Sequence, residues 1–232
     1  MPSAARKLPP PLREGDRLTR EEFMRRWEAM PDVFWAELVD GVVHMPSPVS
    51  LPHSSFHTNL GGWLWHYALA TPGCAATTAG TWLMAGESAP QPDLVLRVLP
   101  EFGGQSRTEG LYPSGAPELA VEISHTTGAR DSGIKRNLYE RSGVKEYLIV
   151  RPSARTLTWL ELVDHVYVNL EPDTEGLMRS RVFPGLWLDP DALWRDDPNA
   201  LRAGVEKGLQ SPEHAAFVAE LRERQQRSPA SF

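Results

Sequence analysis

A chain of 232 residues, of which 41% are apolar, is long enough to bury a substantial core, and we expect one domain with extensions. The formal net charge of −6 argues against a protein coated with positive charge to hold nucleic acid, and the single cysteine, Cys74, excludes an internal disulfide and a multi-cysteine zinc site. No apolar run approaches the length of a membrane span and no secretory signal is visible, so we expect a cytoplasmic protein without a membrane partner.

The first elements expected along the chain are a flexible lead over residues 1–17, then a helix and a hairpin. Thr19 is the expected N-cap of the helix, and Glu22 completes a capping box with it. Asp40-Gly41 separates two strand-like runs and predicts a tight hairpin turn, because such a turn needs positive φ at both central positions. Glu37 lies on the first strand, where it is either an exposed strand acid or an accessory group of a site.

A helix with one apolar face is predicted over residues 53–70. It carries His53 and His57 four residues apart, a spacing that could hold a metal. A zinc-protease motif would need glutamate directly after His53, where Ser54 stands. His53 is therefore either a hydrogen-bonding group at the start of the helix or an accessory group of a site.

The next stretch predicts short strands at residues 80–85 and 92–98, followed by a long polar loop over residues 99–116. Asp93 enters the second strand directly after a proline. By the two-residue period of a strand, Leu94, Leu96 and Val98 lie on the face opposite to Asp93. Asp93 either caps a loop or belongs to a site.

The most informative stretch is residues 117–151, which predict a strand, a loop, a helix and a second strand. Glu122 lies between Val121 and Ile123 in an apolar strand, and a carboxylate buried there must be paired, protonated or bound to a cation. The helix is expected to end at Ser142, before Gly143. It bears three polar residues at spacing i, i+4, i+8, which share one side: Asp131, Lys135 and Tyr139.

The remaining elements complete an α/β (α+β) fold. We expect a strand at 147–150, a hairpin of strands 155–163 and 165–170 around Asp164, an apolar docking segment at 183–188, and short helices at 189–194 and 213–224. A strand followed by a helix and a second strand is typical of a crossover connection between parallel neighbours, so the predicted architecture is a mixed sheet flanked by helices.

Two carboxylates on adjacent strands together with a lysine suit the hydrolysis of phosphodiesters. Asp93 and Glu122 would hold Mg²⁺, or alternatively Mn²⁺, with help from the backbone carbonyl of Ile123, because hard divalent ions prefer such oxygen ligands. The ion would activate water, and a lysine would orient that water and stabilise charge that grows on the phosphate. A surface ion pair of Asp131 with Lys135 is the structural alternative, but it does not account for Glu122.

The motifs resemble the PD-(D/E)XK nuclease superfamily, and within it the restriction endonuclease family called Uma-two. The resemblance covers roughly residues 18–190 and is carried by Pro92-Asp93, by Pro117-Glu-Leu-Ala-Val-Glu-Ile-Ser124, by Arg130-Asp131 with Lys135 and Tyr139, and by Gly143-Val-Lys-Glu-Tyr-Leu-Ile-Val150. It implies a restriction-endonuclease-like core and a Mg²⁺-dependent endonuclease acting on DNA. It also implies that Asp93, Glu122 and Lys135 are catalytic.

The chain departs from the superfamily pattern directly after the glutamate strand. Ser124 occupies the place where the lysine two residues after the glutamate is expected, and Lys135 on the following helix fits as its replacement. Glu37, His53, Ser124, Asp131 and Tyr139 are then accessory groups. His125-Thr126 also departs from the Pro and Ser usual there, and Val150-Arg151-Pro152 lacks the usual Asp before the proline, changes that would alter substrate or activity.

We expect a lead at residues 1–17, the nuclease-like domain at 18–188 and a helical extension at 189–232. Two functions remain open: a DNA endonuclease, for which a homodimer through edge hairpins would suit double-strand cleavage, and a catalytically inactive module of the same fold that binds nucleic acid or protein.

Overall fold

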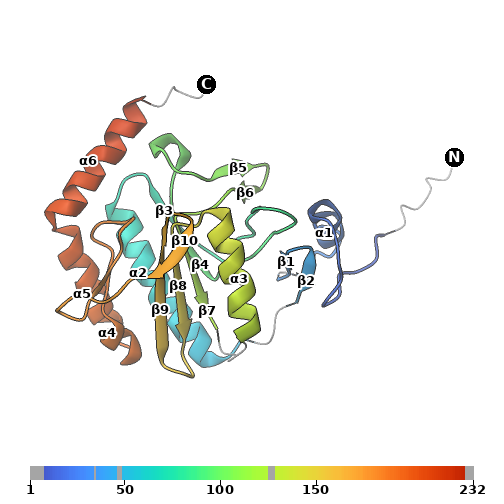
Figure 1. Cartoon of the computed structure of the whole chain (residues 1–232), viewed down its shortest axis with the longest axis horizontal. Helices are drawn as coiled ribbons and strands as arrows, with labels where there is room; N and C mark the ends of the chain where they lie inside the picture. Colours follow the sequence, from blue (N-terminus) through green and yellow to red (C-terminus); the bar gives the residue numbers. More distant parts are fainter. Residues whose placement is uncertain (1–7, 34, 46–48, 125–128, 228–232) are drawn as a thin grey trace.

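The computed structural model describes residues 8–33, 35–45, 49–124 and 129–227, with the side chains of 129–132 outside the description. Its centre is a mixed sheet of six strands in the order β10-β9-β8-β7-β4-β3 (Figure 1). The strands of this sheet are β3 (Cys74–Thr78), β4 (Leu94–Val98), β7 (Leu119–Ile123), β8 (Glu146–Arg151), β9 (Thr156–Val163) and β10 (Val166–Asn169). Neighbouring strands are antiparallel except β7 and β8, which are parallel and joined by α3 (Ala129–Ser142).

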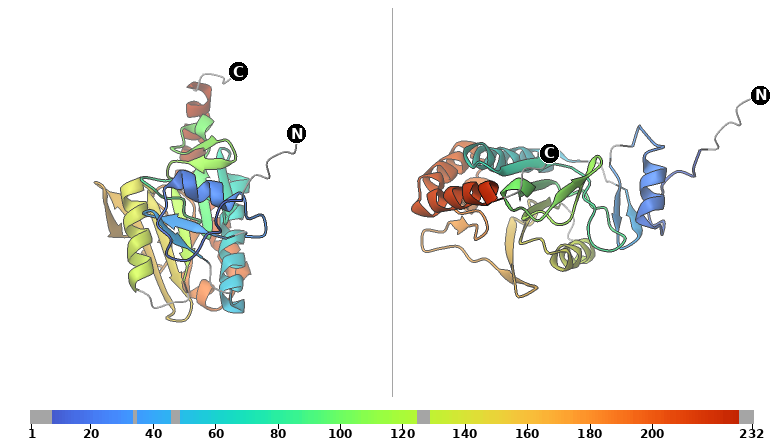
Figure 2. Two further views of the ribbon diagram at one scale, coloured as in Figure 1. Left: turned by 90° about the vertical axis from the view of Figure 1, so that its right-hand side faces the viewer. Right: turned by 90° about the horizontal axis from the view of Figure 1, so that it is seen from above.

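Two helices cover opposite faces of this sheet, as the left view of Figure 2 shows for α2 (Leu51–Ala70) and α3. The residues of β7 alternate between the two faces: Leu119, Val121 and Ile123 belong to the core beneath α2, and Ala120 belongs to the core beneath α3. Glu122 therefore points to the α3 side. The helix α3 ends at Ser142 as predicted, and Gly143 directly after it has φ 85°, the left-handed conformation typical of a residue that ends a helix.

The N-terminal elements form a separate small layer beside the sheet. They are α1 (Arg20–Trp27), β1 (Glu37–Val39) and β2 (Val42–His44). The predicted hairpin is confirmed, with φ 52° at Asp40 and 74° at Gly41. Thr19 caps α1 as expected, but Glu22 differs from the capping-box expectation, because its carboxylate accepts from Arg25 and Arg26.

The C-terminal elements pack on α2 and share its core. They are β11 (Met178–Arg179), β12 (Trp187–Leu188), α4 (Pro190–Trp194), α5 (Pro198–Leu209) and α6 (Pro212–Arg227). Leu201 and Val205 of α5 and Leu221 of α6 are buried in the same cluster as Leu64 of α2. The Tyr67 hydroxyl on α2 also donates to the Pro184 carbonyl.

Three parts of the chain differ from the local expectations. Residues 80–85 form only isolated bridges at Leu83 and Met84, and the edge strand is β3 instead. The expected loop at 99–116 contains a 3₁₀ turn, η1 (Pro100–Phe102), and a hairpin of β5 (Arg107–Glu109) and β6 (Tyr112–Ser114). The helix α5 was not foreseen.

Within the described ranges, no helix combines the length and apolar character that crossing a membrane requires.

Candidate active site

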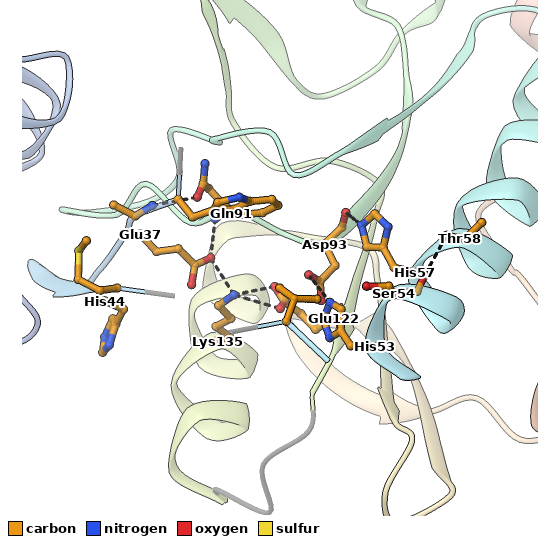
Figure 3. Close-up of a pocket in the computed structure, with 14 residues that line it drawn as sticks. Glu37, His44, His53, Ser54, His57, Thr58, Gln91, Asp93, Glu122 and Lys135 are labelled. Atoms are coloured by element: carbon orange, nitrogen blue, oxygen red, sulfur yellow. Dashed lines mark hydrogen bonds and ion pairs between the residues drawn. The ribbon is translucent and has the colours of Figure 1, made fainter. Parts of the chain in front are cut away.

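The predicted site residues meet at a pocket of about 710 Å³, between the N-terminal hairpin, the start of α2 and one end of the sheet (Figure 3). Five of the residues singled out from the sequence line it: Glu37, His53, Asp93, Glu122 and Lys135. They come from β1, α2, the residue before β4, β7 and α3. Residues far apart in the sequence are thus brought to one concave surface, as a binding or catalytic site requires.

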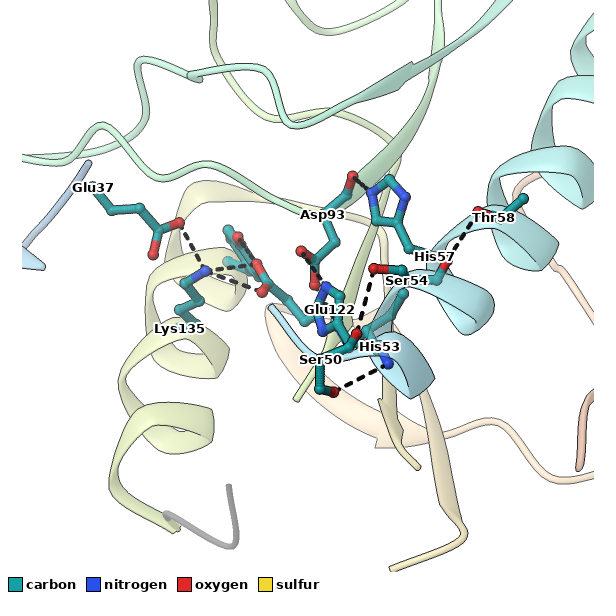
Figure 4. A network of polar contacts seen from close by, with 11 residues as sticks. Glu37, Ser50, His53, Ser54, His57, Thr58, Asp93, Glu122 and Lys135 are labelled. Carbon is teal, nitrogen blue, oxygen red and sulfur yellow. Dashed lines mark hydrogen bonds and ion pairs between the residues drawn. The ribbon is translucent and has the colours of Figure 1, made fainter. Parts of the chain in front are cut away.

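Lys135 joins two of the carboxylates. Its Nζ lies 2.8 Å from Oε1 of Glu37 and 2.9 and 3.0 Å from the two carboxylate oxygens of Glu122 (Figure 4). The side chains are only 19%, 19% and 13% exposed for Lys135, Glu37 and Glu122. The lysine on α3 therefore approaches the strand acid from the neighbouring helix, and Tyr139 one turn further donates its hydroxyl to Glu122 Oε1 at 2.7 Å.

Burial and the neighbouring charges perturb both ends of this ion pair. Burial raises the pKa of Glu122, and Asp93 and Glu37 act in the same direction, whereas Lys135 and the Tyr139 hydroxyl oppose them. Burial acts to lower the pKa of Lys135, but the two carboxylates outweigh it and raise that pKa. The lysine is therefore held as a charged ammonium against a carboxyl group that resists ionisation.

Asp93 lies next to Glu122 because of the strand register. Leu94 pairs with Val121 in antiparallel fashion, so the residue before Leu94 and the residue after Val121 are neighbours on the same face. Asp93 Oδ2 accepts a 2.6 Å hydrogen bond from the Ile123 amide, which fixes the carboxyl group.

His53 lies on the other side of Asp93, with Nε2 at 3.7 Å from Asp93 Oδ1. The Asp93 carboxylate raises the pKa of His53, burial opposes it, and Glu122 and the Ile123 carbonyl raise it further. Two carboxylates and a carbonyl favour the charged form of this imidazole, so the surroundings of His53 stabilise positive charge.

Two residues that contact the site were not among the predicted site residues. His57 Nε2 lies 3.0 Å from the Asp93 carbonyl, so the histidine pair divides between the side chain and the backbone of one aspartate. The amide of Gln91 donates to Glu37 Oε1 at 2.6 Å, and its side chain accepts from the Ala36 amide. The spacing of the two histidines was a usable signal for His57, but nothing in the sequence indicated Gln91, because its contacts with Ala36 and Glu37 join residues far apart in the sequence.

The remaining predicted accessory residues are Ser124 and Asp131. Ser124 donates its amide to the Val150 carbonyl and so continues the β7–β8 pairing. The side chain of Asp131 lies outside the described part of the chain, as do His125 and Thr126. The surface ion pair of Asp131 with Lys135 therefore stays untested, whereas the contacts of Lys135 with Glu37 and Glu122 are direct.

The donor set of the pocket fits a hard divalent ion. Within the described residues no group of three or more His, Cys, Asp or Glu side chains is arranged to hold a metal. Mg²⁺ does not require such a cage, because it is commonly bound through one or two carboxylates, several waters and substrate phosphates. When Glu37, Asp93 and Glu122 are all ionised, their negative charge exceeds the positive charge of Lys135 and a protonated His53, and an added cation would favour that state.

The fold defines the class of protein as mixed α/β, with a six-stranded sheet flanked by helices. A crystal structure described as "a putative nuclease belonging to DUF820 from Anabaena variabilis ATCC 29413" matches it with a TM-score of 0.59 and 16% sequence identity, over 77% of this chain and 98% of that one. At that identity the likeness shows the fold alone. A search of curated proteins gives no match. The model of the family Uma2, described as "Putative restriction endonuclease", matches residues 20–191, and the chain belongs to this family.

Proposed function

We propose that the protein is a metal-dependent endonuclease that hydrolyses phosphodiester bonds in DNA. The observation that carries the proposal is the convergence of Asp93, Glu122 and Lys135 in one pocket. The family description supports the nuclease class.

The residues divide the work by charge. Asp93 and Glu122 would hold Mg²⁺ or Mn²⁺, with the carbonyl of Ile123 as a further oxygen donor, and the ion would supply Lewis-acid stabilisation and a more acidic water. Lys135 keeps its proton and supplies positive charge beside the reacting phosphate. Glu37 and Tyr139 hold Lys135 and Glu122 in place through their hydrogen bonds. Ser124 replaces a strand lysine, so Lys135 from α3 is the proposed source of that charge.

The test is cleavage of plasmid and linear DNA by the purified chain with Mg²⁺ or Mn²⁺, and with a chelator. We expect Glu122→Gln and Asp93→Asn each to lower the cleavage rate by roughly 10²- to 10³-fold, the loss typical of removing a group that stabilises transition-state charge. Glu140→Gln is the matched control, because Glu140 lies on α3 and pairs with Arg136 outside the pocket. Cleavage that persists in both site variants would refute the assignment of the carboxylates.

A nuclease fold retained only for binding nucleic acid or protein is the competing proposal, and the net charge of −6 and the absence of a lysine at position 124 favour it. Unaltered partner binding in Asp93→Asn and Glu122→Gln, without cleavage under any divalent ion, would support it. For the endonuclease we propose a homodimer through the edge strands, which mass measurement in solution tests.

A further inference from the structure

The pocket has two chemically different sides. One is the cluster of Glu37, Asp93, Glu122 and Lys135 described above. The other is apolar and is made by Trp35, Met45 and Val49. The exposed fractions of Trp35 and Val49 are 42% and 64%, so large apolar surface remains open to solvent beside a charged cluster.

Trp35 is partly exposed and directly precedes two residues that are anchored by hydrogen bonds. The next residue, Ala36, is buried and donates its amide to the Gln91 side chain at 3.2 Å. Glu37, one residue further, accepts from the Gln91 amide. Ala36 is thus anchored through its backbone amide and Glu37 through its side-chain carboxylate, and the neighbouring tryptophan, with only two rotatable side-chain bonds, loses little entropy on binding.

A ligand that suits both sides must carry an anionic group and a flat apolar one. A nucleotide has this composition: its phosphate would lie toward Lys135 and a bound cation, and its base toward the indole ring of Trp35. A base inside a duplex has both faces covered by its stacked neighbours, so only an unpaired or extruded base can stack on Trp35. The volume of about 710 Å³ is in the range that encloses a small organic group.

The overall charge also favours stacking on Trp35, rather than general attraction to phosphates, as a source of affinity. Proteins that hold duplex DNA without sequence preference rely on many contacts of lysine and arginine with phosphates. This chain has 24 basic and 30 acidic residues, so attraction to phosphates in general is weak. Stacking of a base on an aromatic ring supplies affinity that does not depend on net charge.

We propose that Trp35 is a stacking platform for an unpaired nucleobase, and that the substrate class of this pocket is single-stranded or locally unpaired DNA. The proposal rests on the proposed nuclease function and adds to it the kind of DNA that the site takes. It assigns specificity to a residue outside the carboxylate and lysine cluster.

The test is fluorescence anisotropy with a labelled single strand and with its duplex. Ca²⁺ replaces Mg²⁺, since it takes the same class of oxygen ligands, and gel analysis confirms that the DNA stays intact. We expect the single strand to bind more tightly than the duplex. Trp35→Ala should weaken single-strand binding by roughly 5- to 150-fold, the range for loss of one aromatic stacking partner. Trp35→Phe keeps a ring and should retain most of the affinity.

Trp65→Ala is the matched control, because Trp65 on α2 is 55% exposed and does not line the pocket. Equal affinities of Trp35→Ala and Trp65→Ala would overturn the proposal, as would equal or tighter binding of the duplex by the unaltered protein, or no measurable binding of the single strand. The outcome is separable from that of the proposed function. Single-strand binding that depends on Trp35 without cleavage under any divalent ion refutes only the nuclease, and cleavage with unchanged binding in Trp35→Ala refutes only the stacking role.

Discussion

Replacing Lys135 by methionine removes the positive charge from the centre of the pocket and keeps most of the side-chain volume. The ammonium group contacts Glu37 at 2.8 Å and Glu122 at 2.9 Å, and all three side chains are less than a fifth exposed. Removing one partner of a buried ion pair commonly costs about 3–5 kcal/mol, because the other charge is left uncompensated. With the remaining exposure taken into account, we expect Lys135→Met to lower the free energy of unfolding by about 2–4 kcal/mol at pH 8.

The size of this loss should depend on pH. Burial already raises the pKa of Glu122 in the folded protein to about 8, from 4.5 for the free side chain, and removing the lysine that opposes this shift raises it further. A carboxyl group whose folded pKa is raised favours folding below its unfolded pKa, and this contribution is lost as the pH rises through the folded value. The loss caused by Lys135→Met is therefore expected to be smaller at pH 5 than at pH 8, because the unpaired Glu122 can take up a proton.

Urea unfolding at the two pH values measures both effects. Lys145→Met is the control, because Lys145 is exposed and its replacement should change stability by less than about 0.5 kcal/mol. The double variant Lys135→Met/Glu122→Gln should recover part of the loss at pH 8. If Lys135→Met loses no more than the control, or loses the same amount at both pH values, the buried ion-pair argument is refuted.

Two further predictions concern residues away from the pocket. Glu146 is fully buried and accepts from the Ser180 hydroxyl at 2.8 Å and from the Arg181 amide at 2.7 Å. Glu146→Ala should lower the free energy of unfolding by about 2–4 kcal/mol, since each buried donor left without an acceptor costs roughly 1–3 kcal/mol. Glu146→Gln keeps one acceptor oxygen and should lower it by less. Equal losses in urea unfolding would contradict this. Gly185→Ala should cost more than about 2 kcal/mol, because Gly185 has φ 90° and an added Cβ would lie 2.8 Å from the Gly208 carbonyl oxygen. A thermal midpoint within a degree of the unaltered protein would argue against that close approach.

The centre of the fold was predictable because its pattern is local. The apolar alternation around Glu122 assigned the two faces of β7, and a glycine after Ser142 marked the end of α3. The strand β3 was not predictable, since Cys74-Ala-Ala-Thr-Thr78 has small side chains and lies at a half-exposed sheet edge. The helix α5 was also not predicted, because Gly208 lowers the helical propensity of its sequence. In the structure the same glycine permits close packing of α5 against Gly185.

The candidate site was predictable in part. A buried strand acid demands a partner, and Lys135 at helical spacing was a reasonable source of one; the structure places Lys135 on Glu122 directly. That Glu37 is the second partner depends on how the hairpin lies against α3, and no sequence pattern encodes that distance. Gln91 contacts Glu37 through its backbone amide and Ala36 through its side chain, and no local pattern indicates contacts between residues so far apart in the sequence.

The helix α2 has a consequence for where the protein can be cut. Its first two turns carry His53 and His57 beside Asp93, and its last turn carries Tyr67, whose hydroxyl donates to the Pro184 carbonyl. The family match ends at residue 191, but Leu201 and Val205 of α5 and Leu221 of α6 are buried in the same cluster as α2. Truncation at residue 191 would expose that apolar face of α2 to water. The catalytic chemistry is thus proposed within the matched region, while the rigidity of the helix that places its histidines is supplied from beyond it.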